Sequence, residues 1–237
     1  MDGDKLESKV IVALDLEDLR EIEETVRELS ILTKWFKIGY QMISSIGIKE
    51  SVRIVKSFNC NVFLDMKLYD IPNTVARAIR NLTKLDIDML TIHISGGSKM
   101  IKEALKSIDD GSDVKLLGVT LLTSFSKEEA KKIYNQDETI DVVKKFARIG
   151  YDMGLRGFVC SPHELKALKS EFSDCIFVVP GIRPSWSLKN DQERFATPYE
   201  AKLNGATYIV VGRPIIKPNN NLKPSYALKS IIEEFSK

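Results

Sequence analysis

The chain has 237 residues, of which 43% are hydrophobic, enough for one large domain with a substantial core. The net charge is only +2, which argues against a dedicated nucleic-acid binder because such proteins usually carry a basic excess. The polar N-terminal tail, residues 1–9, does not resemble a signal peptide, and no apolar run is long enough to cross a bilayer. We therefore expect no membrane association. Three widely spaced cysteines have neither metal nor disulfide spacing, so we expect a protein of the reducing cytoplasm.

Short apolar runs alternate with amphipathic helical patterns along the chain. We expect strands at residues 10–14, 35–38, 62–67, 89–94, 115–121, 157–160, 176–179 and 208–211. We expect helices at residues 19–32, 48–58, 73–84, 99–107, 127–134, 139–153, from 162 onward, 198–204 and 225–235. Such short apolar strands are typical of a parallel sheet covered by helices. The pattern predicts a single α/β domain, residues 1–237, folded as a closed (β/α)8 TIM barrel, with an open doubly wound sheet as the alternative.

Charged residues stand where several of the predicted strands end, which is where barrel enzymes have their chemistry. Asp15 ends the first strand, Lys37 lies in the second, and Asp65 and Lys67 end the third. Residues two apart in a strand share a face, so Asp65 and Lys67 point the same way as Phe63. If that face lines the barrel, a carboxylate and an ammonium are held in a poorly solvated place, which is costly unless they have a function. The alternative is a solvated loop with an ordinary ion pair.

The longest irregular stretch follows the seventh predicted strand. It begins with Pro180 and Gly181 and runs to Thr197, while Gly212 and Arg213 follow the eighth strand. Loops after strands seven and eight of barrels often bind phosphate, because glycine lets backbone amides approach an anion and arginine offers a fork of donors. This pattern favours a phosphate site over a surface loop with an incidental arginine.

The sequence contains no recognisable motif for a metal or a cofactor. His93 and His163 are the two histidines, and their spacing is not that of metal ligands. No Gly-x-Gly-x-x-Gly follows the first strand, and no Walker-type loop is present. We therefore expect neither metal nor cofactor and assign the chemistry to lysines and aspartates.

Short motifs spread over nearly the whole chain occur in the order of one known family. They are Val12-Ala13-Leu14-Asp15, Phe36-Lys37-Ile38-Gly39, Phe63-Leu64-Asp65-Met66-Lys67-Leu68-Tyr69-Asp70-Ile71-Pro72-Asn73-Thr74, Pro180-Gly181-Ile182-Arg183-Pro184, Asp191-Gln192 and Val211-Gly212-Arg213-Pro214. In these motifs the chain resembles the orotidine 5'-phosphate decarboxylase family, and the long block after Phe63 is the most specific. The resemblance implies cofactor-independent decarboxylation of orotidine 5'-phosphate to UMP, the last step of de novo pyrimidine nucleotide biosynthesis, by a homodimer.

The resemblance also implies roles for individual residues. Lys67 would deliver a proton to C6 of the pyrimidine, and Asp65 would face the departing carboxylate. With Lys37 and Asp70 they would form an alternating Lys-Asp-Lys-Asp network. Three residues would complete the partner subunit's site: Asp70, Ile71 and Thr74. The other implied substrate contacts are Asp15 and Lys37 to the ribose, Ser126 or its neighbour Ser124 to the pyrimidine, and Gln192, Arg213 and Gly212, with Pro180 and Gly181, around the phosphate.

Two other functions stay open as alternatives. The nearer one is a metal-dependent sugar-phosphate decarboxylase or synthase of the same barrel group. Enzymes of that group resemble this chain in an Asp-x-Lys-x-x-Asp motif. Those enzymes carry a glutamate at the position of Lys37, where a lysine would repel a metal ion. The other alternative is a non-catalytic barrel that binds a phosphate ligand, although every candidate charged residue is in place.

Overall fold

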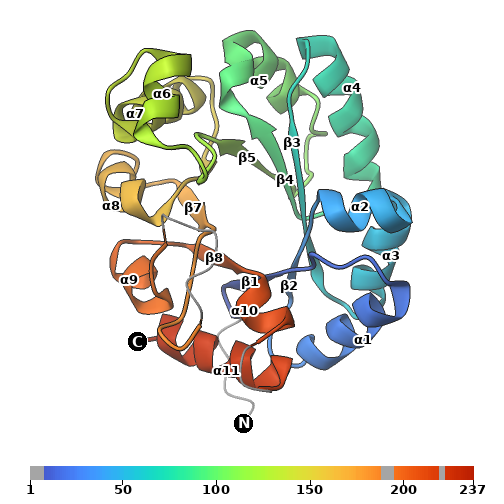
Figure 1. Ribbon diagram of the computed structural model, residues 1–237. Coiled ribbons are helices and arrows are strands. Elements are labelled where there is room, and N and C mark those ends of the chain that lie inside the picture. The colour runs from blue at the N-terminus through green and yellow to red at the C-terminus, as the bar shows by residue number, and fades with distance from the viewer. Residues whose placement is uncertain (1–7, 188–194, 219–221) are drawn as a thin grey trace.

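The computed structural model describes residues 8–187, 195–218 and 222–237, which form a closed barrel of parallel strands surrounded by helices (Figure 1). Neighbouring strands follow chain order, and β1 closes the barrel by pairing with β8. The strands are β1 (Val10–Ala13), β2 (Trp35–Ile38), β3 (Asn61–Leu68), β4 (Met89–His93), β5 (Lys115–Val119), β6 (Gly157–Val159), β7 (Ile176–Val179) and β8 (Tyr208–Val211). The predicted TIM barrel is confirmed, and the open sheet is excluded because it would leave two edges unpaired.

Helices cover the outer face of the barrel. They are α1 (Leu19–Leu29), α2 (Tyr40–Ile46), α3 (Ile48–Ser57), α4 (Pro72–Leu82), α5 (Gly97–Lys106), α6 (Lys127–Tyr134), α7 (Thr139–Asp152), α8 (Pro162–Glu171), α9 (Pro198–Leu203), α10 (Arg213–Ile216) and α11 (Pro224–Phe235), with 3-10 turns η1 (Thr83–Leu85) and η2 (Ile94–Gly96). The sequence patterns predict all of these helices except α2 and α10. Within the described residues, no helix combines the length and the apolar character needed to cross a membrane.

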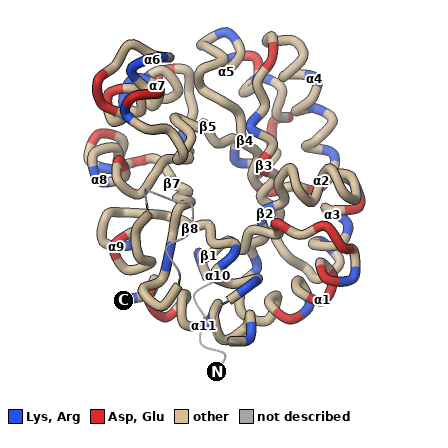
Figure 2. The backbone as a smooth tube through the Cα atoms, in the orientation of Figure 1, with Lys and Arg blue, Asp and Glu red and all other residues tan. Residues whose placement is uncertain are grey.

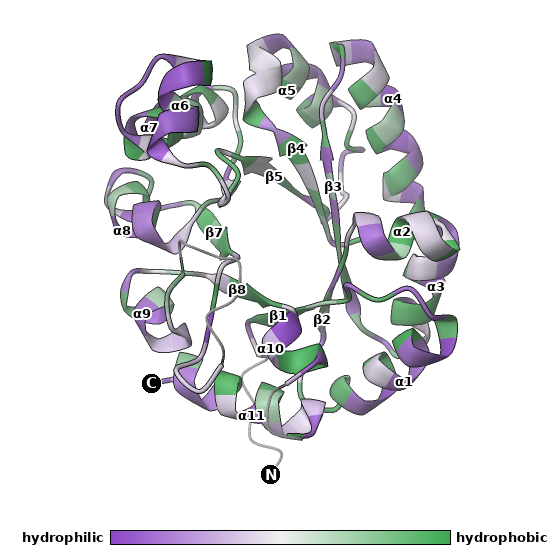
Figure 3. Ribbon diagram, viewed as in Figure 1, coloured by the Kyte–Doolittle hydropathy of each residue, from purple (hydrophilic) through white to green (hydrophobic). Residues whose placement is uncertain are grey.

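Strand side chains alternate between two apolar layers. In β1, Val10 and Val12 pack toward the helices, whereas Ile11 and Ala13 belong to a separate cluster around the barrel axis. That inner cluster comprises Ile11, Ala13, Trp35, Phe63, Met89, Leu117, Val119, Val159, Val178, Tyr208 and Val210. The hydrophobic colouring of Figure 3 follows the strands and the inward helix faces, while Figure 2 places most charged residues on the outer helices. Because Phe63 is in the inner cluster, the charged residues that follow it lie at the mouth of the barrel.

Helix caps fix where several helices begin. The Asp18 carboxylate accepts hydrogen bonds from the backbone N–H groups of Arg20 and Glu21, at 3.0 and 2.9 Å, and so caps α1. Thr197 and Glu200 form a reciprocal capping box at the start of α9. These caps satisfy backbone donors that helix formation would otherwise leave unpaired.

The pairing of β3 with β4 is irregular next to the charged motif. Leu64 pairs with Leu90 and Leu68 pairs with Ile92, so residues 65–67 of β3 face a single residue of β4. Lys67 has a φ of 45°, in the left-handed region that residues other than glycine seldom adopt. The sequence predicts an ordinary strand over residues 62–67, and the structure has a bulge there instead. Bulges of this kind redirect side chains at the end of a strand.

Candidate active site

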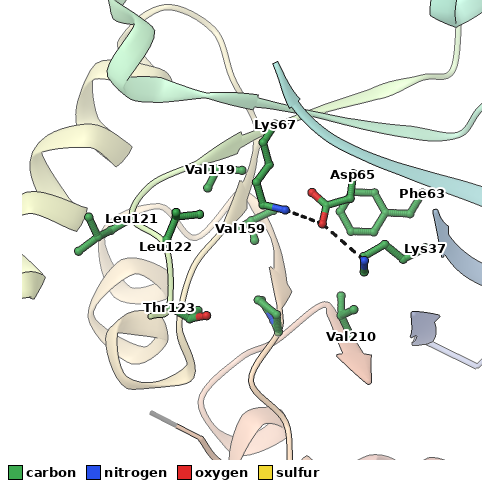
Figure 4. A pocket seen from close by; sticks show the side chains of 11 residues that line it. Lys37, Phe63, Asp65, Lys67, Val119, Leu121, Leu122, Thr123, Val159 and Val210 are labelled. Atoms are coloured by element: carbon green, nitrogen blue, oxygen red, sulfur yellow. Dashed lines mark hydrogen bonds and ion pairs between the residues drawn. The ribbon is translucent and has the colours of Figure 1, made fainter. Parts of the chain in front are cut away.

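A cavity of about 150 Å³ lies at the carboxyl ends of the strands (Figure 4). Its lining residues are Lys37, Phe63, Asp65, Lys67, Val119, Leu121, Leu122, Thr123, Val159, Pro180 and Val210. Most of this lining is apolar, and its charged members come from β2 and β3. An apolar pocket with a few convergent polar groups is the usual form of a site for a small molecule.

Two lysines converge on one carboxylate in this cavity, as Figure 4 shows. The Lys67 Nζ lies 2.7 Å from Asp65 Oδ2, and the Lys37 Nζ lies 3.8 Å from the same oxygen. Lys37 also lies 3.3 Å from Asp15 Oδ1. The Lys37 and Asp65 side chains are each only 13% exposed, and Lys67 is 27% exposed. These charges point into the barrel, which rules out the solvated loop as the setting of the motif.

The charge state of Asp65 follows from its neighbours. Burial on its own would raise the pKa of this carboxyl group. The Lys37 and Lys67 ammonium groups, helped by hydrogen bonds from Lys67 and Thr91, outweigh burial and hold the Asp65 pKa below its usual range. The cavity therefore contains an ionised carboxylate at neutral pH.

The ends of β7 and β8 lie on another side of the same mouth. Pro180 lines the cavity, and Gly181 follows it with a φ of 78°, a conformation that favours glycine. Gly212 precedes α10, and a Cβ atom there would lie 3.2 Å from Asp15 Oδ2. Arg213 is exposed at the first position of α10. Gln192, expected beside the same phosphate, lies outside the described residues.

The residues expected to reach a partner subunit are exposed. Asp70 and Thr74 are exposed, and Ile71 keeps 66% of its surface accessible. The Asp70 carboxylate accepts a hydrogen bond of 2.6 Å from the backbone N–H of Ile71 and, within the described part of the chain, forms no ion pair. Asp70 therefore stands apart from the Lys37–Asp65–Lys67 cluster of its own chain.

A second cavity, of about 290 Å³, adjoins the first through the shared residues Leu121 and Leu122. His93 lines it and packs edge-on against Tyr69, with ring centroids 6.0 Å apart. Burial and the nearby Lys67 ammonium lower the His93 pKa, against a smaller opposing effect of Asp65. His93 is therefore a neutral imidazole at neutral pH.

The segment between β5 and α6 is expected to bring Ser126 or Ser124 to the first cavity, but the polar residue of this segment that lines the cavity is Thr123. The Ser126 hydroxyl accepts a hydrogen bond of 3.2 Å from the Glu129 backbone N–H and caps α6. Ser124 is exposed, and neither serine is among the residues that line the cavity. Thr123 does line it, and Figure 4 shows its side chain at the cavity wall. Its place just after a predicted strand was the signal in the sequence that could have pointed to it.

A closed barrel with clustered lysines and aspartates at the carboxyl ends of its strands is the arrangement of a barrel enzyme. In the described residues, no group of three or more His, Cys, Asp or Glu side chains is placed to hold a metal ion. The chain belongs to the orotidine 5'-phosphate decarboxylase / HUMPS family, which it matches over residues 8–227.

Individual relatives extend this similarity over the whole barrel. The orotidine 5'-phosphate decarboxylase of Opitutus terrae is 40% identical over 227 residues, which cover 95% of this chain and 97% of the relative. The enzyme of the same name from Wolbachia pipientis is 43% identical over 212 residues, covering 89% and 92%. The crystal structure of orotidine 5'-phosphate decarboxylase from Lactobacillus acidophilus aligns with a TM-score of 0.81 at 33% identity, covering 98% of this chain and 100% of that one.

Proposed function

We propose that Lys67 and Asp65 carry out the decarboxylation of orotidine 5'-phosphate at the mouth of this barrel. The activity follows from the family and from the curated relatives: the chain is a carboxy-lyase that converts orotidine 5'-phosphate to UMP in pyrimidine biosynthesis. The observation that supports the residue assignment is the Lys67–Asp65 contact of 2.7 Å inside an apolar cavity.

Lys67 is the proton donor in this mechanism. The bond between C6 and the carboxylate carbon breaks, carbon dioxide leaves, and the electron pair stays on C6. The Lys67 ammonium stabilises this developing negative charge and transfers a proton from Nζ to C6, which completes UMP. The neutral amine then regains a proton from solvent.

Asp65 faces the carboxylate that leaves. Because its pKa is held low, Asp65 stays ionised and repels the substrate carboxylate, and this repulsion ends as carbon dioxide departs. Lys37 balances the Asp65 charge from the other side and, with Asp15, contacts the ribose.

The phosphate binds away from the reacting carbon, at the ends of β7 and β8. Arg213 donates charge-assisted hydrogen bonds to it, with Gln192, the amide of Gly212, and the Pro180–Gly181 turn around it. Binding energy from this remote group serves to position the pyrimidine against Lys67. The exposed Arg213 and the glycine at position 212, where a Cβ atom would crowd Asp15, support this assignment.

The active unit is a homodimer in which each chain completes the other's site. Asp70, Ile71 and Thr74 enter the partner's cavity, and Asp70 becomes the last member of the Lys-Asp-Lys-Asp network. Their exposure in the single chain supports this role, since a carboxylate committed to its own cluster would be paired there.

Ser126, or Ser124, contacts the pyrimidine, and Thr123 is a third candidate because it lines the cavity.

The reaction takes place in a reducing cytoplasm. The three cysteines, Cys60, Cys160 and Cys175, are all buried and form no disulfide with one another, which is the usual state of thiols in that compartment.

The direct test is to mix the purified chain with orotidine 5'-phosphate and follow the pyrimidine absorbance, with and without a metal chelator. We expect the substrate to be consumed at the same rate in both samples. Activity lost in chelator and restored by magnesium would instead identify a metal-dependent member of the barrel group. No change in absorbance in either sample would identify a non-catalytic phosphate-binding barrel.

A further inference from the structure

Thr91 is a fully buried polar residue at the centre of β4, next to the charged cluster. It lies two residues from Met89, which belongs to the inner apolar layer, so its side chain shares that face. Buried hydroxyl groups are costly unless both their donor and their acceptor functions are used. The contacts of Thr91 show how this hydroxyl is used.

The Thr91 hydroxyl joins the main chain of Lys67 to the side chain of Asp65. It accepts a hydrogen bond of 2.8 Å from the Lys67 backbone N–H. It donates one of 3.0 Å to Asp65 Oδ1. The direction is fixed by chemistry, because the amide can only donate and the ionised carboxylate can only accept.

These contacts close a ring around the reacting groups. Asp65 Oδ1 accepts from Thr91, and Asp65 Oδ2 accepts from the Lys67 Nζ at 2.7 Å. Both ends of Lys67, its backbone N–H and its ammonium, are thereby tied to the same threonine–aspartate pair. The carboxylate plane and the direction of the lysine side chain are set together.

The bulge in β3 explains why a side chain is needed here. Residues 65–67 face Thr91 alone, so the Lys67 N–H meets a hydroxyl in place of a backbone carbonyl from β4. Lys67 also has the left-handed φ of 45°, which costs free energy for a residue with a Cβ atom. Strained backbone persists only where surrounding contacts hold it, and the Thr91 hydroxyl supplies such a contact.

We propose that Thr91 is a positioning residue for the decarboxylation, whose hydroxyl holds the bulged Lys67 backbone and the Asp65 carboxylate in the geometry that the reaction requires. It lines neither cavity, so it acts through Asp65 and Lys67 and not by contact with the substrate. This inference rests on the proposed roles of Lys67 and Asp65.

Three substitutions at position 91 distinguish a positioning role in the reaction from an effect on the stability of the fold alone. Thr91→Val keeps the shape of the side chain and removes the hydroxyl, and we expect kcat to fall at least about tenfold while KM for orotidine 5'-phosphate changes little. Thr91→Ser restores the hydroxyl and should recover most of kcat. Thr91→Cys, which donates and accepts only weakly, should lie between them and replaces the valine variant if that chain does not fold.

Thr33→Val is the matched control. The Thr33 hydroxyl is also buried. It donates a hydrogen bond of 2.7 Å to the Val10 carbonyl and accepts one of 3.3 Å from the Trp35 N–H, but it lies at the opposite end of the barrel. This variant should lose stability and keep kcat. Equal losses of kcat at positions 33 and 91, or a serine variant as slow as the valine variant, would overturn the proposal.

A titration of the free protein tests the same contact without turnover. Removal of the Thr91 hydrogen bond should raise the Asp65 pKa, which carboxyl-carbon NMR can follow, with Asp65→Asn to assign the signal. An unchanged Asp65 pKa in Thr91→Val would contradict the proposal even if the chain had a different substrate. A wild-type chain that leaves orotidine 5'-phosphate intact would contradict the proposed function alone.

Discussion

Two ammonium groups lie close to one carboxylate oxygen of Asp65, the Lys67 Nζ at 2.7 Å and the Lys37 Nζ at 3.8 Å, in a site that is mostly closed to water. Such an arrangement is weak support for stability, because desolvation of the charges offsets much of their attraction. It is informative about function, since perturbed and clustered charges gather where chemistry occurs. A regular strand over residues 62–67 predicts that Asp65 and Lys67 share a face. The structure confirms that their side chains meet, although the backbone between them forms a bulge.

Arg213→Ala tests the phosphate assignment. The proposed contact is a charge-assisted hydrogen bond to a group remote from C6, so its loss should mainly raise KM, by about tenfold or more, with a smaller fall in kcat. Steady-state kinetics with orotidine 5'-phosphate measure both constants. Arg148→Ala removes a surface arginine paired with Glu171 and should change neither. A lower kcat at unchanged KM for Arg213→Ala would argue against phosphate binding.

His93 should make the stability of the fold depend on pH. Its folded pKa lies below the ordinary value of 6.5, so the unfolded chain takes up the proton first as pH falls. The contribution of His93 is therefore complete above about pH 6.5 and is lost as pH falls toward the folded pKa. Denaturant unfolding from about pH 7 to about pH 5 should show a smaller loss of stability in His93→Asn than in the wild type. Identical losses in the two chains would contradict this account.

At the scale of elements, Ser126 caps the start of α6 and is also a proposed contact of the pyrimidine. Ser126 and Glu129 form a capping box, so Ser126→Ala should lower the free energy of unfolding by about 1 kcal/mol. Denaturant unfolding measures this, and Ser124→Ala, at an exposed position, is the control that should have almost no effect. Equal stability of the Ser126 variant and the wild type would contradict the capping role. A KM that also rises in Ser126→Ala would support the pyrimidine contact, whereas an unchanged KM would favour Thr123.

The strands are well predicted from the sequence because each is a short apolar run between polar breaks. α2 and α10 are missed because they have seven and four residues, too few for a helical period to show. The bulge in β3 is missed for a different reason. Lysine has no preference for a left-handed backbone, and the group that holds Lys67 there comes from Thr91, 24 residues further along the chain. A contact of that kind depends on tertiary structure and leaves no local pattern.

At the scale of the whole molecule, barrel closure converts separate strand ends into one site. Asp15, Lys37 and Asp65 come from different units of the chain, and the Lys37 Nζ lies 3.3 Å from Asp15 Oδ1 and 3.8 Å from Asp65 Oδ2. The rule that parallel strands end on one rim predicts this gathering. It does not predict which neighbouring side chain enters the cavity, and the placement of Thr123 there depends on the path of the loop after β5.

The proposed dimer with shared sites predicts complementation between two inactive chains. Lys67→Ala and Asp70→Asn should each lack activity alone, and a mixture allowed to exchange subunits should regain part of it, because each hybrid contains one intact site. A mixture of Lys67→Ala with Asp65→Asn is the control, since every hybrid site then lacks a residue. The absorbance assay measures all of these samples. A mixture of the first pair that stays inactive after exchange would argue that Asp70 serves its own chain.

The most direct test of the mechanism is the turnover of orotidine 5'-phosphate by Lys67→Ala. If the Lys67 ammonium protonates C6, its loss should lower kcat by at least about a hundredfold while the circular dichroism of the barrel stays unchanged. Lys106→Ala, which removes an exposed lysine on α5, should keep the wild-type rate. A folded Lys67→Ala chain that converts the substrate at a near-normal rate would contradict the central claim.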